Sequence, residues 1–410
     1  MTELAVDRDR LVAWASRAIE TPSFTGSEQA MAEVVAQTLA EMGLQVQWQQ
    51  VEVGRANVLG TRPGTGGGPS LMFNGHMDTS YSGREAWLAH VPGFQPSAFV
   101  EDGRLYGLGI SNMKGALACY VEALRALDDA AVRLRGDVLI AAVCGEIEKA
   151  QWGDAQGAEF RGYAAGTRHL VTHGGVADMC ILGEPTESKV VLGHFGSLWV
   201  RVSTQGDFVH TAFTEGRRGR NSILRMREVL DAVLEWIPRW EDDPENAFRG
   251  AKAIVNVGGM EGGFGWRVSR TPHRTDLFLD VRVPPTKEMA VARGQVLELV
   301  RELQARFPDY GVEGEIYVTA PGAEIAEDHP LVAALDEAHE EVFGSRPDRD
   351  VTRWFSDASA LTRYGVPTVN YGTSSGLLDT VKGENLEIDG LVKTAEVYAR
   401  AAMKVCGVVE

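Results

Sequence analysis

The sequence has few cysteines, no long apolar run and a shortage of basic residues. Its four cysteines are scattered without a Cys-x-x-Cys pair: Cys119, Cys144, Cys180 and Cys406. This spacing favours buried thiols over a disulfide framework. No apolar run approaches the roughly 20 residues of a membrane helix, so we expect no membrane partner. Lys and Arg number 40 against 57 Asp and Glu, and the resulting net charge of −17 argues against a nucleic-acid partner.

We expect no signal peptide at the start of the chain. Residues 1–10 are polar and of mixed charge, without the basic region and apolar core of a signal peptide. We therefore expect a cytoplasmic protein. The length of 410 residues favours more than one domain. A hydrophobic content of 44% and a charged content of 24% are ordinary for a globular enzyme.

Most of the chain alternates helical and strand patterns, which predicts an α/β domain built on a mixed sheet. Residues 7–42 have the pattern of two amphipathic helices, and residues 113–128 of another. Residues 45–59 are predicted to form a strand. Continuous apolar runs at 71–74, 138–144 and 179–182 are typical of strands buried on both faces. The α/β pattern returns after residue 330, with helix 331–342, strand 367–371 and a last helix from 389.

The pattern changes between residues 194 and 319. Residues 197–204 alternate apolar and polar side chains, as half-buried antiparallel strands do. Strands are predicted at 197–204, 254–258, 275–283 and 314–319, with helices at 221–236 and 289–307. This order is that of a ferredoxin-like, split βαβ domain. We therefore expect a discontinuous α/β domain, residues 1–193 and 320–410, interrupted by an α+β domain at 194–319.

Polar side chains follow the predicted buried strands of the α/β domain. Strand 71–74 is followed by Gly-His-x-Asp-Thr, in which His76 and Asp78 point to the same face of an extended chain. An imidazole supported by a carboxylate is a common arrangement in metal sites. Further candidates are a glycine-rich turn at 107–115, strand ends with Glu146 and Glu184, and His210 after a strand of the inserted domain. Each of these polar residues alone is a weak signal, because a polar side chain at a strand end often simply faces water. Together they predict a polar site at one edge of the sheet.

Five motifs carry a resemblance to a known family. They are Gly75-His76-Met77-Asp78-Thr79, Asn112-Met113-Lys114-Gly115, Gly183-Glu184-Pro185-Thr186, Asp280-Val281-Arg282 and Asp357-Ala358. In order and spacing the chain resembles the metal-dependent aminoacylase and carboxypeptidase family of acetylornithine deacetylase, succinyl-diaminopimelate desuccinylase and glutamate carboxypeptidase. The resemblance covers nearly the whole chain. It implies a metal-dependent hydrolase acting on a C–N bond of a small carboxylate substrate, with the inserted domain as lid and homodimer contact.

The chain departs from the family pattern at one of two metal sites. The family binds one metal through the His of the first motif and the Glu of the fourth. The other metal is bound by the second Glu of an Asp-Glu-Glu motif and by a C-terminal His, and an Asp bridges the two metals. Here the bridging residue is Asn112, the second Glu aligns with Ile147, and no His follows His339.

These losses favour a site for one divalent ion, Mn, Zn or Co. Its expected ligands are His76, Asn112 and Glu184, with Glu146 as the general base that takes a proton from water. A second alignment puts Glu148 in the ligand place, and Asp379 lies where the missing His would be. Either residue would then restore the second metal site.

The resemblance assigns further roles. Asp78 would orient His76, and His210 would stabilise the oxyanion, unless it is simply a core histidine. Candidate substrate contacts are His194, Arg220, Asn221, Arg353 and Ser375, although a run of charge is more often a solvated surface. Lys114 and Asp357 are expected to be structural.

Other functions remain open. One alternative is a conventional N-acyl-amino-acid deacylase or dipeptidase. A second is an aminohydrolase that displaces the amine of an electron-poor aromatic acid, as the family's outlier 5-nitroanthranilic acid aminohydrolase does. The third is a non-catalytic binding protein, against which the joint presence of His76, Asp78, Glu146 and Glu184 argues.

Overall fold

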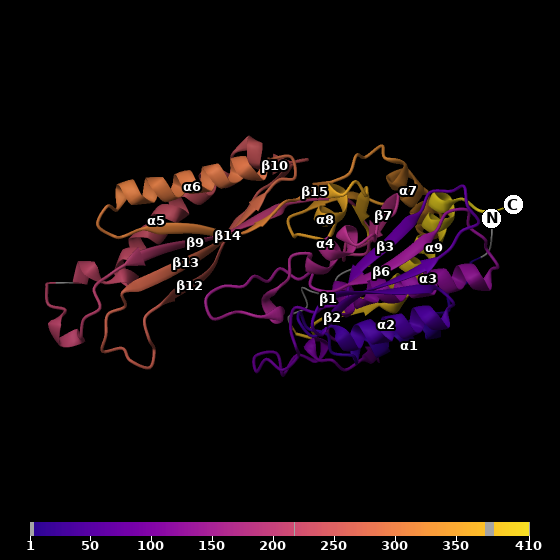
Figure 1. The fold of residues 1–410 in the computed structure, drawn as a ribbon, viewed down its shortest axis with the longest axis horizontal. Coiled ribbons are helices and arrows are strands. Elements are labelled where there is room, and N and C mark those ends of the chain that lie inside the picture. The colour runs from indigo at the N-terminus through magenta and orange to yellow at the C-terminus, as the bar shows by residue number, and fades with distance from the viewer. Residues whose placement is uncertain (1–3, 217, 374–380, 410) are drawn as a thin grey trace. The chain divides into compact units, whose positions relative to one another are not determined.

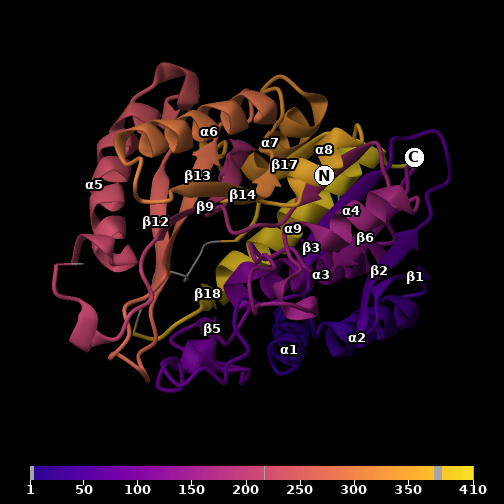
Figure 2. The ribbon, with the colours of Figure 1, turned by 60° about the vertical axis from the view of Figure 1, so that its left-hand side comes forward.

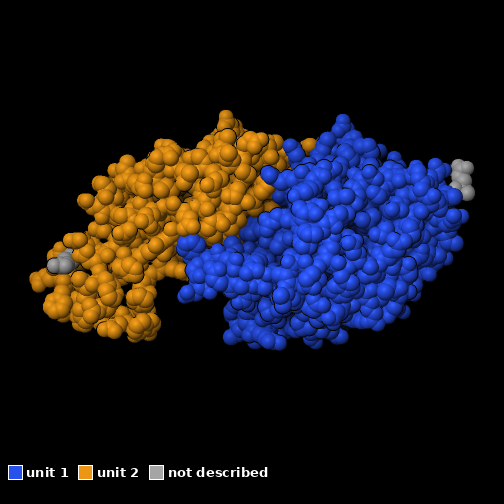
Figure 3. Space-filling view, in the orientation of Figure 1, with its two compact units in different colours: residues 1–193, 324–350, 356–410 blue, residues 194–323, 351–355 orange. Residues whose placement is uncertain are grey.

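The computed structural model describes residues 4–216, 218–373 and 381–409. The chain forms two compact units, coloured separately in Figure 3. Unit 1 comprises Met1–Gly193, Glu324–Asp350 and Ser356–Glu410, and unit 2 comprises His194–Ala323 and Val351–Phe355. The second boundary differs from the expected 319/320, and a short later segment joins unit 2. Both differences follow from backbone pairing with β9 (Gly196–Gln205) and the residue before it. Ala320 still pairs with Ser197, and the backbone oxygen of Thr352 accepts a hydrogen bond from the N–H of Phe195 at 2.9 Å.

The elements follow one another in an α/β order, an α+β order and again an α/β order (Figure 1). In unit 1 and its boundaries they are α1 Arg8–Ile19, α2 Gln29–Glu41, β1 Gln45–Glu52, β2 Arg55–Arg62, β3 Leu71–His76, β4 Phe99–Glu101, β5 Arg104–Tyr106, α3 Gly115–Asp129, β6 Val138–Val143, α4 Ala165–Thr172, β7 Met179–Leu182, β8 Val190–His194, β15 Ala323–Glu324, α7 Pro330–Phe343, β16 Arg349–Thr352, α8 Ala358–Arg363, β17 Thr368–Asn370, β18 Asn385–Glu387 and α9 Ile388–Cys406. In unit 2 they are β9 Gly196–Gln205, α5 Ser222–Glu241, β10 Ala247–Phe248, β11 Ala251–Lys252, β12 Val255–Gly262, β13 Arg274–Val283, α6 Met289–Arg306 and β14 Glu313–Ala320.

The large sheet is mixed, as the sequence predicts. Its strands run in the order β1-β2-β6-β3-β7-β17-β8-β15, with β16 beside β8. The centre is parallel: β3 pairs with β6 on one side and β7 on the other, and β17 continues beside β7. The carboxyl ends of β3, β6 and β7 are therefore adjacent, which is where open α/β sheets hold their ligands.

Helices cover both faces of this sheet. Contacts place α1, α2, α3, α7 and α9 on one face and α4 and α8 on the other. Figure 2 shows α3 and α9 running side by side on the first face. The core between them is apolar, and the central strands β3, β6 and β7 are buried along most of their length because both faces are covered.

One strand prediction is wrong. Residues 45–59 were expected as a single strand, but they form the hairpin of β1 and β2. The turn between them lies at Val53 and Gly54, where Gly54 has a φ of +77°. Glycine adopts this left-handed conformation without steric cost. The turn reverses the chain inside a stretch that has Val at 46, 51, 53 and 58, on both sides of the turn.

Unit 2 has the expected split βαβ fold. Its sheet runs in the order β12-β13-β9-β14, and every pairing is antiparallel. Helices α5 and α6 lie on one face, as Figure 1 shows. Leu198, Val200 and Val202 of β9 point to the helices and are buried. Across the described part of the chain, no helix is both long and apolar enough to cross a membrane.

Candidate metal centre

His76 ends β3 with both ring nitrogens facing oxygen atoms. Its Nδ1 lies 2.8 Å from the backbone oxygen of Asp78, and its Nε2 lies 2.8 Å from Oδ1 of Asn112. The ring is completely buried. In the protonated ring both nitrogens donate to these oxygens. When Nε2 loses its proton, donation from Nδ1 to the carbonyl fixes the tautomer whose Nε2 lone pair can bind a cation.

Two carboxylates converge on the same nitrogen. Oε2 of Glu146 and Oε1 of Glu184 each lie 3.7 Å from Nε2 of His76. Glu146 follows β6 and Glu184 follows β7, so the parallel register brings all three residues to one edge of the sheet. Among the described residues, these three form the one group of three or more His, Cys, Asp or Glu donors that could hold a metal ion.

Burial makes the ionised forms of these acids unfavourable. It raises the pKa of Glu184 to about 7, against the lowering effect of His76. Burial, with the charges of Glu184, Asp357 and Asp78, also raises the pKa of Glu146 well above its usual range. For His76, burial alone would lower the pKa, but Glu184, Asp78 and the hydrogen bond to Asn112 raise it overall. The site therefore holds an excess of negative charge that a cation would relieve.

The donor chemistry fits a divalent metal ion. Oε1 of Glu184 is buried, and no donor among the described residues reaches it. An imidazole nitrogen beside carboxylate and amide oxygens suits zinc, manganese or cobalt. An unpartnered buried carboxylate oxygen is costly unless a cation or proton occupies the site.

Asp78 connects His76 to Glu146, though not as the sequence suggests. Its carboxylate is 3.6 Å from Nδ1 of His76, while its backbone oxygen takes the closer contact. The carboxylate instead accepts the backbone N–H groups of Glu146 at 3.1 Å and Ile147 at 3.2 Å, and the hydroxyl of Thr25 at 3.0 Å. Asp78 thus fixes the turn after β6 that carries Glu146.

The residues that align with the second metal site of the family pattern are only partly described. Ile147 is buried, and Glu148 is half-buried and close enough to raise the pKa of Glu146 and Glu184. Glu148 is not in the three-residue donor group. Asp379 lies outside the described residues, as does Ser375.

Sequence reasoning assigned only a structural role to Asp357, which lies near the centre. Its Oδ2 accepts the hydroxyl of Thr167 at 2.7 Å, while its buried Oδ1 has no donor among the described residues. Burial raises the pKa of Asp357 to about 6, and its charge acts on His76, Glu146 and Glu184. Thr167 lies on α4, which the sequence patterns did not reveal, so no local signal links it to Asp357.

The remaining predicted site residues belong to unit 2. His194 is buried, and burial lowers its pKa to about 4, so it is neutral. His210 is partly exposed, and its Nδ1 accepts the backbone N–H of Ala212 at 3.2 Å. Arg220 pairs with Asp207 at 2.9 Å, and Arg353 donates to the backbone oxygen of Lys252 at 2.7 Å.

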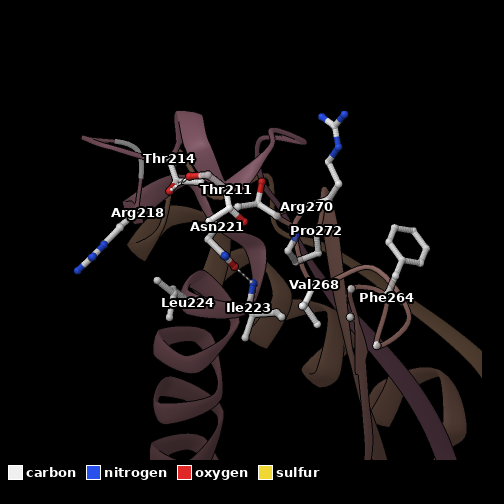
Figure 4. Close-up of a pocket in the computed structure, with 14 residues that line it drawn as sticks. Thr211, Thr214, Arg218, Asn221, Ile223, Leu224, Phe264, Val268, Arg270 and Pro272 are labelled. Carbon is white, nitrogen blue, oxygen red and sulfur yellow. Dashed lines mark hydrogen bonds between the residues drawn. The ribbon is translucent and has the colours of Figure 1, made fainter.

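Asn221 lines a pocket at the start of α5 (Figure 4). The cavity measures about 500 Å³ and has apolar walls that include Ile223, Leu224 and Val268. Its Asn221 side chain accepts the backbone N–H of Ile223 at 2.9 Å, so the amide caps the helix. Figure 4 shows the guanidinium groups of Arg218 and Arg270 pointing away from the pocket centre. The pocket is thus mainly apolar.

Comparison with known families gives a decisive match. The model of peptidase family M20/M25/M40 matches residues 72–404. The chain belongs to this family. Its fold and its enzyme class, a metal-dependent hydrolase acting on C–N bonds, are those that the motifs predict. The M20 match spans both units, so the inserted unit is part of the family fold.

Two curated relatives align over nearly their full length. Acetylornithine deacetylase of Vibrio parahaemolyticus is 25% identical over 399 residues, covering 97% of each chain. Succinyl-diaminopimelate desuccinylase of Alkalilimnicola ehrlichii is 27% identical over 405 residues, covering 96% of this chain and 98% of its own.

Solved structures share the fold. A tripeptidase from Staphylococcus aureus has a TM-score of 0.76 and 17% identity, with 98% of this chain and 99% of that chain covered. A Bacillus subtilis peptidase, described as dinuclear metal-binding, has a TM-score of 0.64 and 15% identity, with coverage of 98% and 99%. At these identities the likeness shows the fold alone.

Proposed function

We propose that this M20 enzyme cleaves a C–N bond in a small, carboxylate-bearing substrate and works with one divalent metal ion per chain. The observation that carries the proposal is the amide of Asn112, 2.8 Å from Nε2 of His76. In the family pattern this residue is the carboxylate shared by two metals. A neutral amide fits one ion, which needs less negative charge than two. The single three-residue donor group of the described chain supports the same reading.

In this proposal the ligands are His76, Asn112 and Glu184, with water in the open positions. Zinc, manganese and cobalt all suit this set. When bound, a divalent ion would lower the pKa of a water molecule and polarise the bond under attack. Asp78 holds the imidazole through its backbone oxygen and so keeps Nε2 aimed at the ion.

Glu146 is the proposed general base. Its carboxylate lies beside His76 Nε2 and within the donor group, so it can take a proton from a water at the centre. The water oxygen then adds to the electrophilic carbon, the C–N bond breaks, and Glu146 returns the proton to the leaving amine. Burial and the charge of Glu184 raise the pKa of Glu146 above its usual range, which makes its carboxylate a stronger base when it is ionised.

The resemblance to the family suggests further groups that would act on the substrate. We propose His210 as the oxyanion-stabilising group and Arg220, Asn221, Arg353 and Ser375 as candidate contacts of the substrate carboxylate. The buried, neutral state of His194 makes it the weakest of these candidates.

We also propose a homodimer formed through unit 2. This unit presents β12 at the edge of its sheet, and exposed apolar side chains at Phe213, Met260, Trp266 and Val268. Edge strands and exposed apolar patches are usual sites of association. Light scattering on a size-exclusion column would give the mass of two chains, and Met260→Lys together with Val268→Lys would give that of one. A monomeric wild-type protein would contradict this.

Metal content tests the proposal most directly. Metal-free protein is titrated with manganese and with zinc, dialysed, and analysed for metal per chain. We expect one ion at saturation, and a loss of that ion in His76→Ala and Glu184→Gln. Glu122→Gln is the matched control, since Glu122 is also buried but pairs with Arg10. Two tightly held ions per chain would overturn the one-metal proposal.

A substrate panel tests the reaction. It contains N-acetyl and N-succinyl amino acids, dipeptides, and 5-nitroanthranilate as an electron-poor aromatic amine. Release of amine or ammonia that Glu146→Gln abolishes would support hydrolysis and also identify the bond. Binding without turnover, unaffected by Glu146→Gln, would point to a non-catalytic binding protein.

A further inference from the structure

Glu384 is a buried acid for which the motifs predict no role. It lies directly before β18 in unit 1 and is 5% exposed. Its Oε2 accepts the backbone N–H of Ser111 at 3.1 Å, and its backbone oxygen accepts the N–H of Gly107 at 3.2 Å. The following strand, β18, pairs with β5. Glu384 is thus anchored in place and reaches the loop that precedes α3.

This loop carries Asn112, whose backbone is not helical and is therefore not fixed by helical hydrogen bonds. Asn112 has φ −135° and ψ 94°, outside the helical region. Gly109, at the start of the loop, has a φ of +84°, and a Cβ added there would meet Cγ2 of Thr79 at 2.6 Å. The loop therefore lies close against the strand end of the metal centre, and side-chain contacts must fix its last residues.

The Glu384 carboxylate is suited to that task. Burial raises its pKa to about 7, while backbone hydrogen bonds from Gly109, Ser111 and Asn112 and the charge of Lys114 lower it. Lys114 itself is buried and donates to the backbone oxygens of Ala18 and Thr21, each at 2.8 Å. Charge-assisted hydrogen bonds that a carboxylate accepts from backbone N–H groups are stronger than neutral ones. The loop is therefore held from both sides.

We propose that Glu384 is a positioning residue for the metal centre: its carboxylate holds the backbone at Ser111 so that the amide oxygen of Asn112 faces His76. The path is short, because Ser111 and Asn112 are adjacent and Oδ1 of Asn112 lies 2.8 Å from Nε2 of His76. The inference rests on the proposed function, in which Asn112 is a metal ligand. It adds a residue from the C-terminal part of the chain to a centre built from residues 76–184.

The experiment is a double-mutant cycle on metal affinity. Wild type, Glu384→Gln, Asn112→Ala and the double variant are made metal-free, and zinc and cobalt affinities are measured by competition with a chromophoric chelator. The cobalt absorption spectrum reports the ligand set independently of activity. Glu122→Gln is the control, because Glu122 is another buried carboxylate that accepts a backbone N–H, that of Asp7 at 2.9 Å. Melting curves show which variants are folded.

We expect Glu384→Gln to weaken metal affinity about tenfold or more. This is the usual effect of losing a residue that orients a metal ligand through hydrogen bonds. It should change the cobalt spectrum, whereas Glu122→Gln should lower only the melting temperature. In the double variant the two effects should not add, because Glu384 acts through Asn112. If Glu384→Gln does not fold, the same cycle is run with Glu384→Asp, which keeps the charge but shortens its reach.

The outcomes separate this inference from the proposed function. Suppose that Asn112→Ala weakens metal binding. Then wild-type metal affinity in Glu384→Gln, or additive effects in the double variant, would overturn the positioning role of Glu384 and leave the proposed ligand set intact. Wild-type affinity in Asn112→Ala would overturn the proposed ligand set and with it the role of Glu384.

Discussion

The backbone N–H of Glu146 donates a hydrogen bond to Oδ1 of Asp78 at 3.1 Å, across two parallel strands of the sheet. The next N–H, that of Ile147, donates to the other oxygen of the same carboxylate. One acid at the end of β3 thus fixes the turn that carries the proposed base, and its backbone oxygen fixes the imidazole. The relative placement of His76 and Glu146 depends on this one residue.

Replacement of Asp78 by Asn should therefore impair the centre. An amide has one acceptor oxygen, so its NH₂ group would face one of the two N–H donors. We expect metal affinity or kcat/KM to fall about 10- to 100-fold. Asp178→Asn is a suitable control, because Asp178 also accepts a backbone N–H, that of Ser70 at 2.7 Å, but at an exposed place. Equal effects of both substitutions would contradict a role at the centre.

The Glu146→Gln variant should show whether Glu146 acts as a general base or as a metal ligand. A general base contributes about 10²- to 10⁴-fold, so kcat should fall by that factor. Metal content should stay at the wild-type value if His76, Asn112 and Glu184 hold the ion. Loss of metal would show that Glu146 is a ligand. Glu148→Gln tests the second alignment, in which Glu148 is a metal ligand, and loss of bound metal in this variant would favour it.

The metal-free protein should become less stable as the pH rises from about 5 to 7. In the folded protein Glu184 and Glu384 keep their protons up to a pKa of about 7, whereas their ordinary value is 4.5. The folded state thus binds more protons in this window, and stability falls with pH. The raised pKa of His76 acts in the same direction, while the lowered pKa of Lys114, about 7, restores stability only above pH 7.

Calorimetric melting temperatures at pH 5 and pH 7 check this expectation. Bound metal should reduce the dependence, since Glu184 is then engaged, and Glu384→Gln should reduce it because one titrating group is gone. A melting temperature that rises over this range in the metal-free protein would contradict the expectation.

Arg55 should be the most sensitive charged residue for folding. It is fully buried, donates to both oxygens of Glu28 at 2.8 and 2.7 Å, and reaches the backbone oxygens of Ala158 and Arg161 at 3.1 Å. Arg55→Ala leaves Glu28 buried without its partner, which typically costs about 3–5 kcal/mol of unfolding free energy. Denaturant unfolding measures this.

Two controls for Arg55→Ala also alter an ion pair between Arg and Glu. Arg306→Ala breaks the exposed pair with Glu235 and should change stability little. Arg55→Met combined with Glu28→Leu should be less destabilising than Arg55→Ala alone, because no unpaired charge remains. A double variant worse than the single would show that the backbone contacts of Arg55 matter more than the ion pair.

The framework of the fold follows from local patterns. Continuous apolar runs gave β3, β6 and β7, and alternation gave the strands of unit 2, because burial on one or two faces leaves a periodic trace in the sequence. His76, Glu146 and Glu184 were found for the same reason, since each follows a recognisable strand and adjacent parallel strands bring their ends together.

What the sequence could not predict depends on contacts between distant segments. Glu384 reaches Ser111 across 273 residues, and Thr167 reaches Asp357 across 190, and neither contact leaves a periodic pattern. The hairpin of β1 and β2 was missed because strand-forming residues continue up to its turn. The contacts of the Asp78 carboxylate with two backbone N–H groups could not be predicted, because backbone N–H groups leave no sequence signal.

The contact between Glu384 and Ser111 has a consequence for biosynthesis. His76, Asn112, Glu146 and Glu184 all leave the ribosome before Glu384, so the emerging chain can assemble the sheet edge while the loop of Asn112 still lacks its acceptor. A chain that ends before Glu384 would keep every proposed ligand without the carboxylate that we propose holds one of them. We therefore expect such a truncated chain to bind the metal more weakly than the full chain does.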